Sequence, residues 1–281
     1  MAGLEDTGGR VAEAARERSL YRWLQRAGWA FARVFSILAL ALAWELAARS
    51  GAFTPYMLPA LSAVLERIWN DLFTGDLLTN TAVTLYRALS GFLIGAAAGV
   101  ALGMGISRNR LTRWFFDPII SVGFPMPKIA FLPVVILWLG VYDVSKITMI
   151  AVEGVFPVVT ATVVGIRGVE RELLWSARNM GAGERELLWQ IALPAALPQI
   201  ITGLQVALPI ALIVAIVTEM FMGGYGLGGA MNTAARFADS RGVFAGIVEI
   251  AVIGYALVKG MTMMRRRLLL WHQEAVAPST A

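Results

Sequence analysis

The stretch LLWSARNMGAGERELLWQIALP, residues 173–194, is the one long polar-studded interval between two strongly apolar blocks in the second half of the chain. Apolar residues recur in its first half at helical spacing, at Leu173, Leu174, Ala177 and Met180. The run Gly181-Ala182-Gly183 permits a sharp turn. Glu184 and Glu186 then fall in the first turn of a second helix, where the helix dipole favours acids. The stretch is therefore predicted to be a hairpin of two short helices.

The second helix of this hairpin has an apolar side made by Leu187, Leu188 and Ile191. Pro194 and Pro198 are expected to close the hairpin before the next apolar run, because proline lacks a backbone donor and clashes with the preceding turn. Two interpretations are open on physical grounds. The hairpin either lies on the membrane surface and connects two spans, or fills a groove in a soluble partner.

Composition sets the class of protein. Of the 281 residues, 58% are hydrophobic and only 15% are charged, and the mean hydropathy is +0.67. These values are typical of a polytopic membrane protein and not of a soluble domain. The net charge of +5 does not indicate nucleic-acid binding, because the basic residues lie at the ends of apolar blocks. The chain has no cysteine, which excludes disulfides, a thiolate nucleophile and a cysteine zinc site.

The apolar blocks predict an all-α protein with six membrane spans, each near the roughly 20 residues that cross a bilayer. The spans are residues 29–48, 81–107, 114–140, 146–165, 199–222 and 242–264. The third span contains Pro118, Pro125, Pro127 and Pro133. We expect it to be broken, which membrane proteins tolerate where the break lines a cavity.

The order of these blocks predicts the domain organisation. A polar tail precedes the first span, and an amphipathic piece at residues 60–73 follows that span. The divisions are a cytoplasmic tail 1–28, a first span with an external amphipathic segment 29–80, a core 81–264 carrying the hairpin 166–198, and a tail 265–281. Arginines concentrate in both tails and in the loops 107–113 and 166–198, whereas the opposite side has mixed charge. Both termini are therefore expected in the cytoplasm.

The other motifs in the sequence say less about function. Gly224, Gly226 and Gly229 satisfy G-x-G-x-x-G but follow an apolar helix in an expected external loop, so dinucleotide binding is disfavoured. No P-loop motif occurs, so the chain is not by itself a P-loop ATPase. The single histidine, His272, has no second histidine with which to hold a metal. Glycines also recur every fourth residue from 91 to 103, which favours close helix packing inside one subunit over a dimer seam.

The hairpin resembles the cytoplasmic loop of ABC-importer permeases, whose pattern is Glu-Ala-Ala, three residues, Gly, nine residues, Ile-x-Leu-Pro. The matching residues are Ala177, Gly181, Ile191, Leu193 and Pro194. Trp175 stands where the pattern has glutamate, and Ser176 stands where it has its first alanine.

The resemblance extends over residues 85–273 and looks like the permease subfamily for nitrate, taurine and aliphatic sulfonates. Its successive signatures are Tyr86-Arg87, Gly91-Phe92, Leu102-Gly103, Ser107-Arg108, Asp117-Pro118, Pro125-x-Pro127-x-Ile129-Ala130, Leu132-Pro133, Trp138-Leu139-Gly140, Ser145-Lys146, Gly226-Leu227-Gly228 and Trp271-His272. Glu153 and Glu249 depart from the neutral residues expected in that subfamily.

The resemblance implies a type I ABC importer (MetI-like) permease fold in a bacterial inner membrane, and a chain that is not an enzyme. Two permease subunits, expected to be identical, would form the pathway for a small anion or sulfonate-like compound delivered by an external binding protein. Two separate ATPase subunits would bind ATP and Mg and dock on the hairpins, leaving no cofactor on this chain. The implied coupling residues are Ala177, Gly181, Leu187, Leu188, Ile191, Leu193 and Pro194.

Ionisable residues within apolar spans are the candidate pathway groups, because such residues cost free energy in lipid and often mark transport routes. They are Lys128, Glu153 and Glu219, with Glu249 as a fourth ionisable residue within the spans. Lys128 is either a contact for an anionic substrate or a structural partner of Glu153. The same residues also support a rival class, an ion-gradient-driven secondary transporter or channel, which would not explain the hairpin pattern.

Overall fold

The computed structural model describes residues 35–270, and all regular secondary structure in that range is helical. The predicted all-α class is confirmed. The chain divides into two units between Glu66 and Arg67. In the first unit, a helix over residues 35–49 is the described part of the first predicted span. Its Glu45 carboxylate accepts hydrogen bonds from the Ser62 N–H (3.1 Å) and hydroxyl (2.9 Å), next to the start of α2 (Leu61–Thr74), the predicted amphipathic helix.

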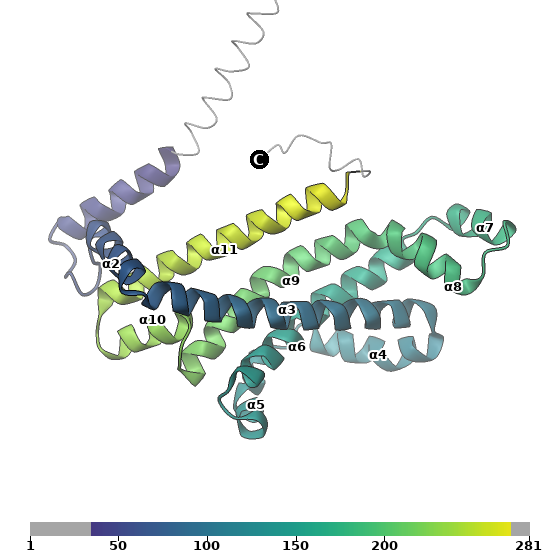
Figure 1. Ribbon diagram of the computed structural model, residues 1–281, viewed down its shortest axis with the longest axis horizontal. Helices are drawn as coiled ribbons and strands as arrows, with labels where there is room; N and C mark the ends of the chain where they lie inside the picture. The colour runs from purple at the N-terminus through teal and green to yellow at the C-terminus, as the bar shows by residue number, and fades with distance from the viewer. Residues whose placement is uncertain (1–34, 271–281) are drawn as a thin grey trace, which may run out of the picture. The chain divides into compact units, whose positions relative to one another are not determined.

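Three long helices form the centre of the second unit (Figure 1): α3 (Asp76–Arg108), α6 (Asp143–Arg167) and α9 (Leu193–Met222). The glycine ridge of α3 lies directly on α6. A Cβ at Gly95 would be 2.6 Å from the carbonyl oxygen of Ala151. The ridge therefore packs within the chain, and it allows α3 and α6 to run parallel at close backbone distance.

The third predicted span is broken, as expected. It consists of α4 (Arg110–Gly123), the short 3₁₀-helix η1 (Lys128–Phe131) and α5 (Leu132–Leu139), and the two halves are bent by 93°. Asn109 caps the start of α4, because its side-chain oxygen accepts a hydrogen bond from the Leu111 N–H at 2.9 Å.

The hairpin differs from the prediction in its second arm. After α7 (Arg171–Asn179), the chain turns into α8 (Glu184–Glu186), a π-helix η2 (Leu187–Ala192) and then α9, which together form one 39-residue helix from Glu184 to Met222. The prediction that Pro194 and Pro198 close the hairpin is wrong. A π-turn widens the helix just before Pro194, which makes room for the proline ring and redistributes the backbone bonds that it interrupts.

The loop predicted at residues 223–241 also contains a helix, α10 (Leu227–Arg236), before the last span α11 (Ser240–Leu268). Within residues 35–270, four helices are long and apolar enough to cross a membrane, and the bent pair α4 and η1–α5 can supply a fifth span. The first of the six predicted spans begins outside the described residues.

Candidate functional site

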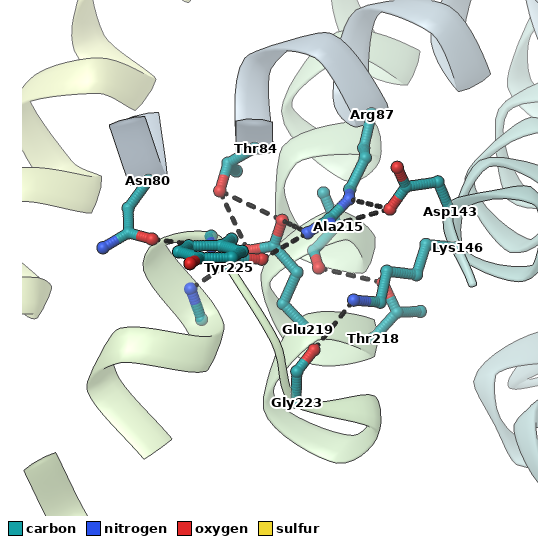
Figure 2. Close-up of polar contacts among 12 residues, drawn as sticks. Asn80, Thr84, Arg87, Asp143, Lys146, Ala215, Thr218, Glu219, Gly223 and Tyr225 are labelled. Carbon is teal, nitrogen blue, oxygen red and sulfur yellow. Dashed lines mark hydrogen bonds and ion pairs between the residues drawn. The ribbon is translucent and has the colours of Figure 1, made fainter. Parts of the chain in front are cut away.

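A buried ionic network lies at the end of α9 (Figure 2). Glu219, in the last turn of α9, is fully buried, and the buried Arg87 of α3 donates to its Oε1 at 2.8 Å. The Thr84 hydroxyl, one turn earlier on α3, donates to Oε2 at 2.9 Å. A buried carboxylate is stable only when it is paired and hydrogen-bonded, and Glu219 is both.

Glu219 and its neighbours also cap the start of α10. The Gly228 N–H donates to Glu219 Oε2 at 3.1 Å, and the Leu227 N–H donates to the Thr84 hydroxyl at 2.9 Å. The Gly226 N–H donates to the side-chain oxygen of Asn80 at 2.9 Å. These are three of the amides of the G-x-G-x-x-G run, and they are bonded to side chains of the same chain.

Gly226 is required at this position for a steric reason. Its φ of +125° is unfavourable for L side chains, and a Cβ there would collide with the Glu219 carboxylate.

The network extends to α6 and to the turn before α10 (Figure 2). Arg87 forms an ion pair with Asp143 at 2.7 Å and donates to the carbonyl oxygen of Tyr225 at 2.6 Å. The buried Lys146 donates to the carbonyl oxygen of Gly223 at 2.9 Å. Two cations and two anions thus join α3, the start of α6 and the end of α9 to one turn of backbone. The network's formal charges balance, which offsets part of the cost of burying them.

A second cluster surrounds Lys128 at the break of the third span. Its ammonium donates to the carbonyl oxygens of Gly123 (2.9 Å), Met126 (3.2 Å) and Phe124 (3.4 Å). The Glu153 carboxylate lies 3.5 Å away, and the ring of Phe156 lies beneath the ammonium at 4.3 Å. The carbonyl groups at a helix C-terminus lack intrahelical partners and attract cations, so Lys128 stabilises the end of α4.

The structure therefore brings Lys128 and Glu153 together but places Glu219 in the separate network. Glu249 is separate again. It lines a cavity of about 510 Å³ with the charged residues Arg67, Asp71, Asp76 and Asp239. Arg67 pairs with Asp71 at 2.9 Å and with Asp239 at 2.7 Å, and the hydrogen bond to Asp71 raises the pKa of Arg67.

The hairpin turn is built on Gly181, whose φ is +92°, and a Cβ there would meet nothing within 4 Å. The carbonyl oxygen of Ala177 accepts from the Met180 N–H (3.2 Å) and the Ala182 N–H (3.0 Å). In the second arm, the Glu186 carboxylate accepts from the Gly183 N–H at 2.9 Å. These bonds close the turn.

The residues that the resemblance assigned to coupling differ in how deeply they are buried. Ala177 and Leu187 are 3% and 4% exposed, so they pack inside the hairpin. The large apolar side chains on its surface are Leu173, Trp175, Met180 and Trp189, with exposures of 49%, 56%, 82% and 53%. In the sequence, Trp175 stood out as the residue at the position of the pattern's glutamate, and Leu173 and Met180 were named only as apolar residues at helical spacing.

Sequence reasoning missed most of the buried network. Its members Thr84, Arg87, Asp143 and Lys146 were not among the candidate site residues. The sequence did contain a signal for these residues. Three of the signatures on which the resemblance rests include members of the network or of the turn it holds, and they are Tyr86-Arg87, Ser145-Lys146 and Gly226-Leu227-Gly228. The structure shows that these signatures meet at one place.

A helical protein with several apolar spans, a broken span and ion pairs buried between its helices is a multi-pass membrane protein of the transport class. The chain belongs to the family of binding-protein-dependent transport system inner membrane components, whose model matches residues 91–269. This confirms the resemblance.

Named relatives support the assignment. The SsuC protein of Bacillus subtilis (strain 168), named as an aliphatic sulfonates transport permease, is 31% identical over 92% of this chain and 93% of its own length. The taurine transport system permease TauC of Escherichia coli (strain K12) is 29% identical over 85% and 89%. The riboflavin transport system permease RibX of Chloroflexus aurantiacus is 30% identical over 89% and 94%.

A solved structure shares the fold. A chain of the MetNI methionine ABC transporter, in a structure of its inward-facing conformations, superimposes with a TM-score of 0.55 at 18% identity, covering 73% of this chain and 96% of that one. The predicted MetI-like permease fold is confirmed. The chain is thus a multi-pass inner membrane permease of a binding-protein-dependent ABC importer, and the comparisons do not favour the gradient-driven alternative.

Proposed function

We propose that two copies of this chain form the translocation pathway of an importer for a small anion of the sulfonate type. An external binding protein delivers the solute, and two separate ATPase subunits, which hold ATP and Mg, dock on the hairpins at residues 166–198. The names of the SsuC and TauC relatives support the sulfonate class. RibX, of similar identity and coverage, carries a different solute in its name, so the substrate must be tested directly.

One observation carries the coupling part of the proposal. The second arm of the hairpin is continuous with α9, so a single helix runs from Glu184 to the turn that holds Glu219. Closure of the ATPase dimer would displace the hairpin. Because no loop separates the second arm of the hairpin from α9, this displacement would be passed on to the whole helix. The position of the hairpin would then shift the equilibrium between the inward-open and outward-open states of the pathway.

The docking surface follows from burial. Trp175, Met180 and Trp189, together with Leu173, present exposed apolar area on the hairpin, and exposed aromatic and methionine side chains are typical anchors of protein interfaces. Ala177 and Leu187 contribute by holding the two arms together, since both are buried in the chain itself. Gly181 sets the turn, and the remaining coupling candidates Leu188, Ile191, Leu193 and Pro194 belong to the continuous helix.

The test is reconstitution of the permease with its ATPase and binding protein in vesicles. We expect uptake of taurine or a short alkanesulfonate that requires ATP and the binding protein. Uptake driven by an ion gradient without ATP would overturn the importer proposal. ATP-driven uptake of riboflavin without uptake of sulfonates would overturn only the substrate class.

Docking is tested separately by copurification. Met180→Asp places a charge on the exposed tip of the hairpin and should remove most of the bound ATPase, because a desolvated, unpaired carboxylate is costly in an interface. Met180→Leu keeps the apolar contact and should retain the ATPase at normal stoichiometry. If Met180→Asp retains it as well, the exposed side chain of Met180 lies outside the contact.

A further inference from the structure

The turn between α3 and α4 forms a strongly basic cavity that the proposed function does not use. The cavity has a volume of about 530 Å³ and is lined by Arg108, Arg110, Arg113, Trp114, Asp117 and Pro118. Within residues 35–270, none of the three arginines forms an ion pair. Arg113 donates at 3.4 Å to the carbonyl oxygen of Ile106, at the end of α3. The lining therefore has a net positive formal charge, because it holds three arginines and one acid, Asp117.

The helix that starts at this cavity presents an apolar face to its surroundings. No residue of α4 is buried, and the exposed apolar side chains recur at helical spacing. They are Leu111, Trp114, Phe115, Ile119 and Val122, with exposures between 48% and 75%. The polar residues Arg113 and Asp117 lie on the other side of the helix by the same spacing. On a membrane helix such a stripe faces an apolar environment, not water.

The dimensions fit one lipid molecule. The stripe from Leu111 to Val122 is about 17 Å long at 1.5 Å per residue. One leaflet of the bilayer core is about 15 Å thick. The arginines lie at one end of the stripe, whereas Lys128 at the other end is buried and bonded within the chain. Trp114 lies beside the arginines, and tryptophan is enriched at the boundary between headgroup and hydrocarbon.

We propose that the cavity formed by Arg108, Arg110 and Arg113 binds the phosphate headgroup of an anionic phospholipid, whose acyl chains lie along the apolar stripe of α4. Basic pockets at the ends of membrane helices bind anionic headgroups in this way, and guanidinium groups match phosphate oxygens with paired hydrogen bonds. This site goes beyond the proposed function, because it depends on membrane insertion alone and not on what is transported.

The experiment uses the purified full-length chain in detergent. It is titrated with phosphatidylglycerol, with phosphatidylcholine or with inorganic phosphate, and bound molecules are counted by native mass spectrometry. We expect phosphatidylglycerol to bind and phosphatidylcholine to bind at least about tenfold more weakly, since each near-surface arginine favours an anionic lipid. The variant Arg108→Gln/Arg110→Gln should weaken phosphatidylglycerol binding by about thirtyfold.

The control variant Arg266→Gln/Arg267→Gln removes the same charge from exposed arginines at the end of α11 and should bind phosphatidylglycerol as the unaltered chain does. An equal loss in both variants would mean general attraction to basic residues, and would overturn the site. Displacement of phosphatidylglycerol by equimolar inorganic phosphate would assign the cavity to a free anion instead of a lipid. Unchanged lipid binding in Arg108→Gln/Arg110→Gln, with loss of the copurifying ATPase, would assign it to a protein contact.

If the double variant cannot be purified, Arg110→Gln alone serves. It should weaken phosphatidylglycerol binding by about fivefold, again without an effect on phosphatidylcholine. Normal binding of phosphatidylglycerol by Arg110→Gln would also overturn the proposal.

Discussion

Glu219 is a fully buried carboxylate that accepts hydrogen bonds from Arg87, Thr84 and the start of α10. Glu219→Gln keeps the shape of the side chain but leaves Arg87 with only Asp143 as an anionic partner. Breaking one side of a buried ion pair destabilises a protein by about 3–5 kcal/mol. We expect a clear drop in the midpoint of thermal unfolding of the purified chain. Glu172→Gln, at an exposed position of α7, should leave the midpoint unchanged.

A double variant separates the ion pair from other effects. Arg87→Met/Glu219→Leu removes both charges, and apolar pairs replace buried ion pairs with little loss. The double variant should lose less of its unfolding midpoint than Arg87→Met and Glu219→Leu lose when their separate losses are added. Strict additivity would show that Arg87 and Glu219 act independently, against the geometry of the network.

Lys128 is tested at the same scale. It donates to three carbonyl oxygens at the end of α4 and lies 3.5 Å from Glu153, so we assign it a structural role at the break of the third span. Lys128→Met should lower the unfolding midpoint and reduce uptake in parallel, and Lys128→Met/Glu153→Met should recover part of the stability. A pathway contact would behave differently. It would raise the KM for an anionic solute at unchanged stability.

At the scale of elements, the hairpin turn depends on the backbone of Gly181. Its φ is +92°, and a Cβ there would touch nothing, so a substitution costs backbone strain and not a clash. Gly181→Val should therefore strain the turn by about 1–2 kcal/mol and reduce uptake more than it reduces ATP hydrolysis. Gly183→Val is the matched control, because Gly183 has a φ of −74° that valine adopts readily. Equal uptake in both variants would show that the turn geometry is not needed for coupling.

The elements also show what the sequence could and could not predict. The turn at Gly181 and the broken third span were predicted, because a glycine between two helical patterns and four prolines in one apolar block have direct backbone consequences. The continuous helix through Pro194 was not, because the π-helix before it depends on a hydrogen-bond pattern that residue spacing does not specify. The helix α10 was not predicted either, because its segment is rich in glycine, which is typical of loops.

The buried network escaped prediction for a different reason. Arg87 and Glu219 are 132 residues apart in the chain, and neither has a local pattern that names its partner. Lys128 and Glu153 could be paired in advance only because both were rare charges in neighbouring spans. Long-range pairing depends on how α3, α6 and α9 pack, and the apolar pattern identifies these helices without fixing their contacts.

At the scale of the whole molecule, the arginines predict an orientation. Arg108, Arg110 and Arg113 lie at the end of α3, and the hairpin and the end of α11 carry further arginines. The opposite helix ends carry mixed charge, including Asp76, Asp143 and Asp239 with Arg236 and Arg241. Basic residues are retained on the cytoplasmic side of a membrane. We therefore expect the hairpin inside the cell and α10 outside.

The absence of cysteine makes this orientation directly measurable, because any introduced thiol is the only one in the chain. In intact cells, a membrane-impermeant maleimide should label Arg236→Cys at once and Asn179→Cys only after permeabilisation. Both positions are exposed and lie at opposite ends of the helix bundle. Val252→Cys, an exposed position in the middle of α11, is the control for lipid burial and should stay unlabelled in both conditions, because hydrocarbon keeps the charged reagent away. Labelling of Asn179→Cys in intact cells would invert the orientation, and an ATPase in the cytoplasm could then not reach the hairpin.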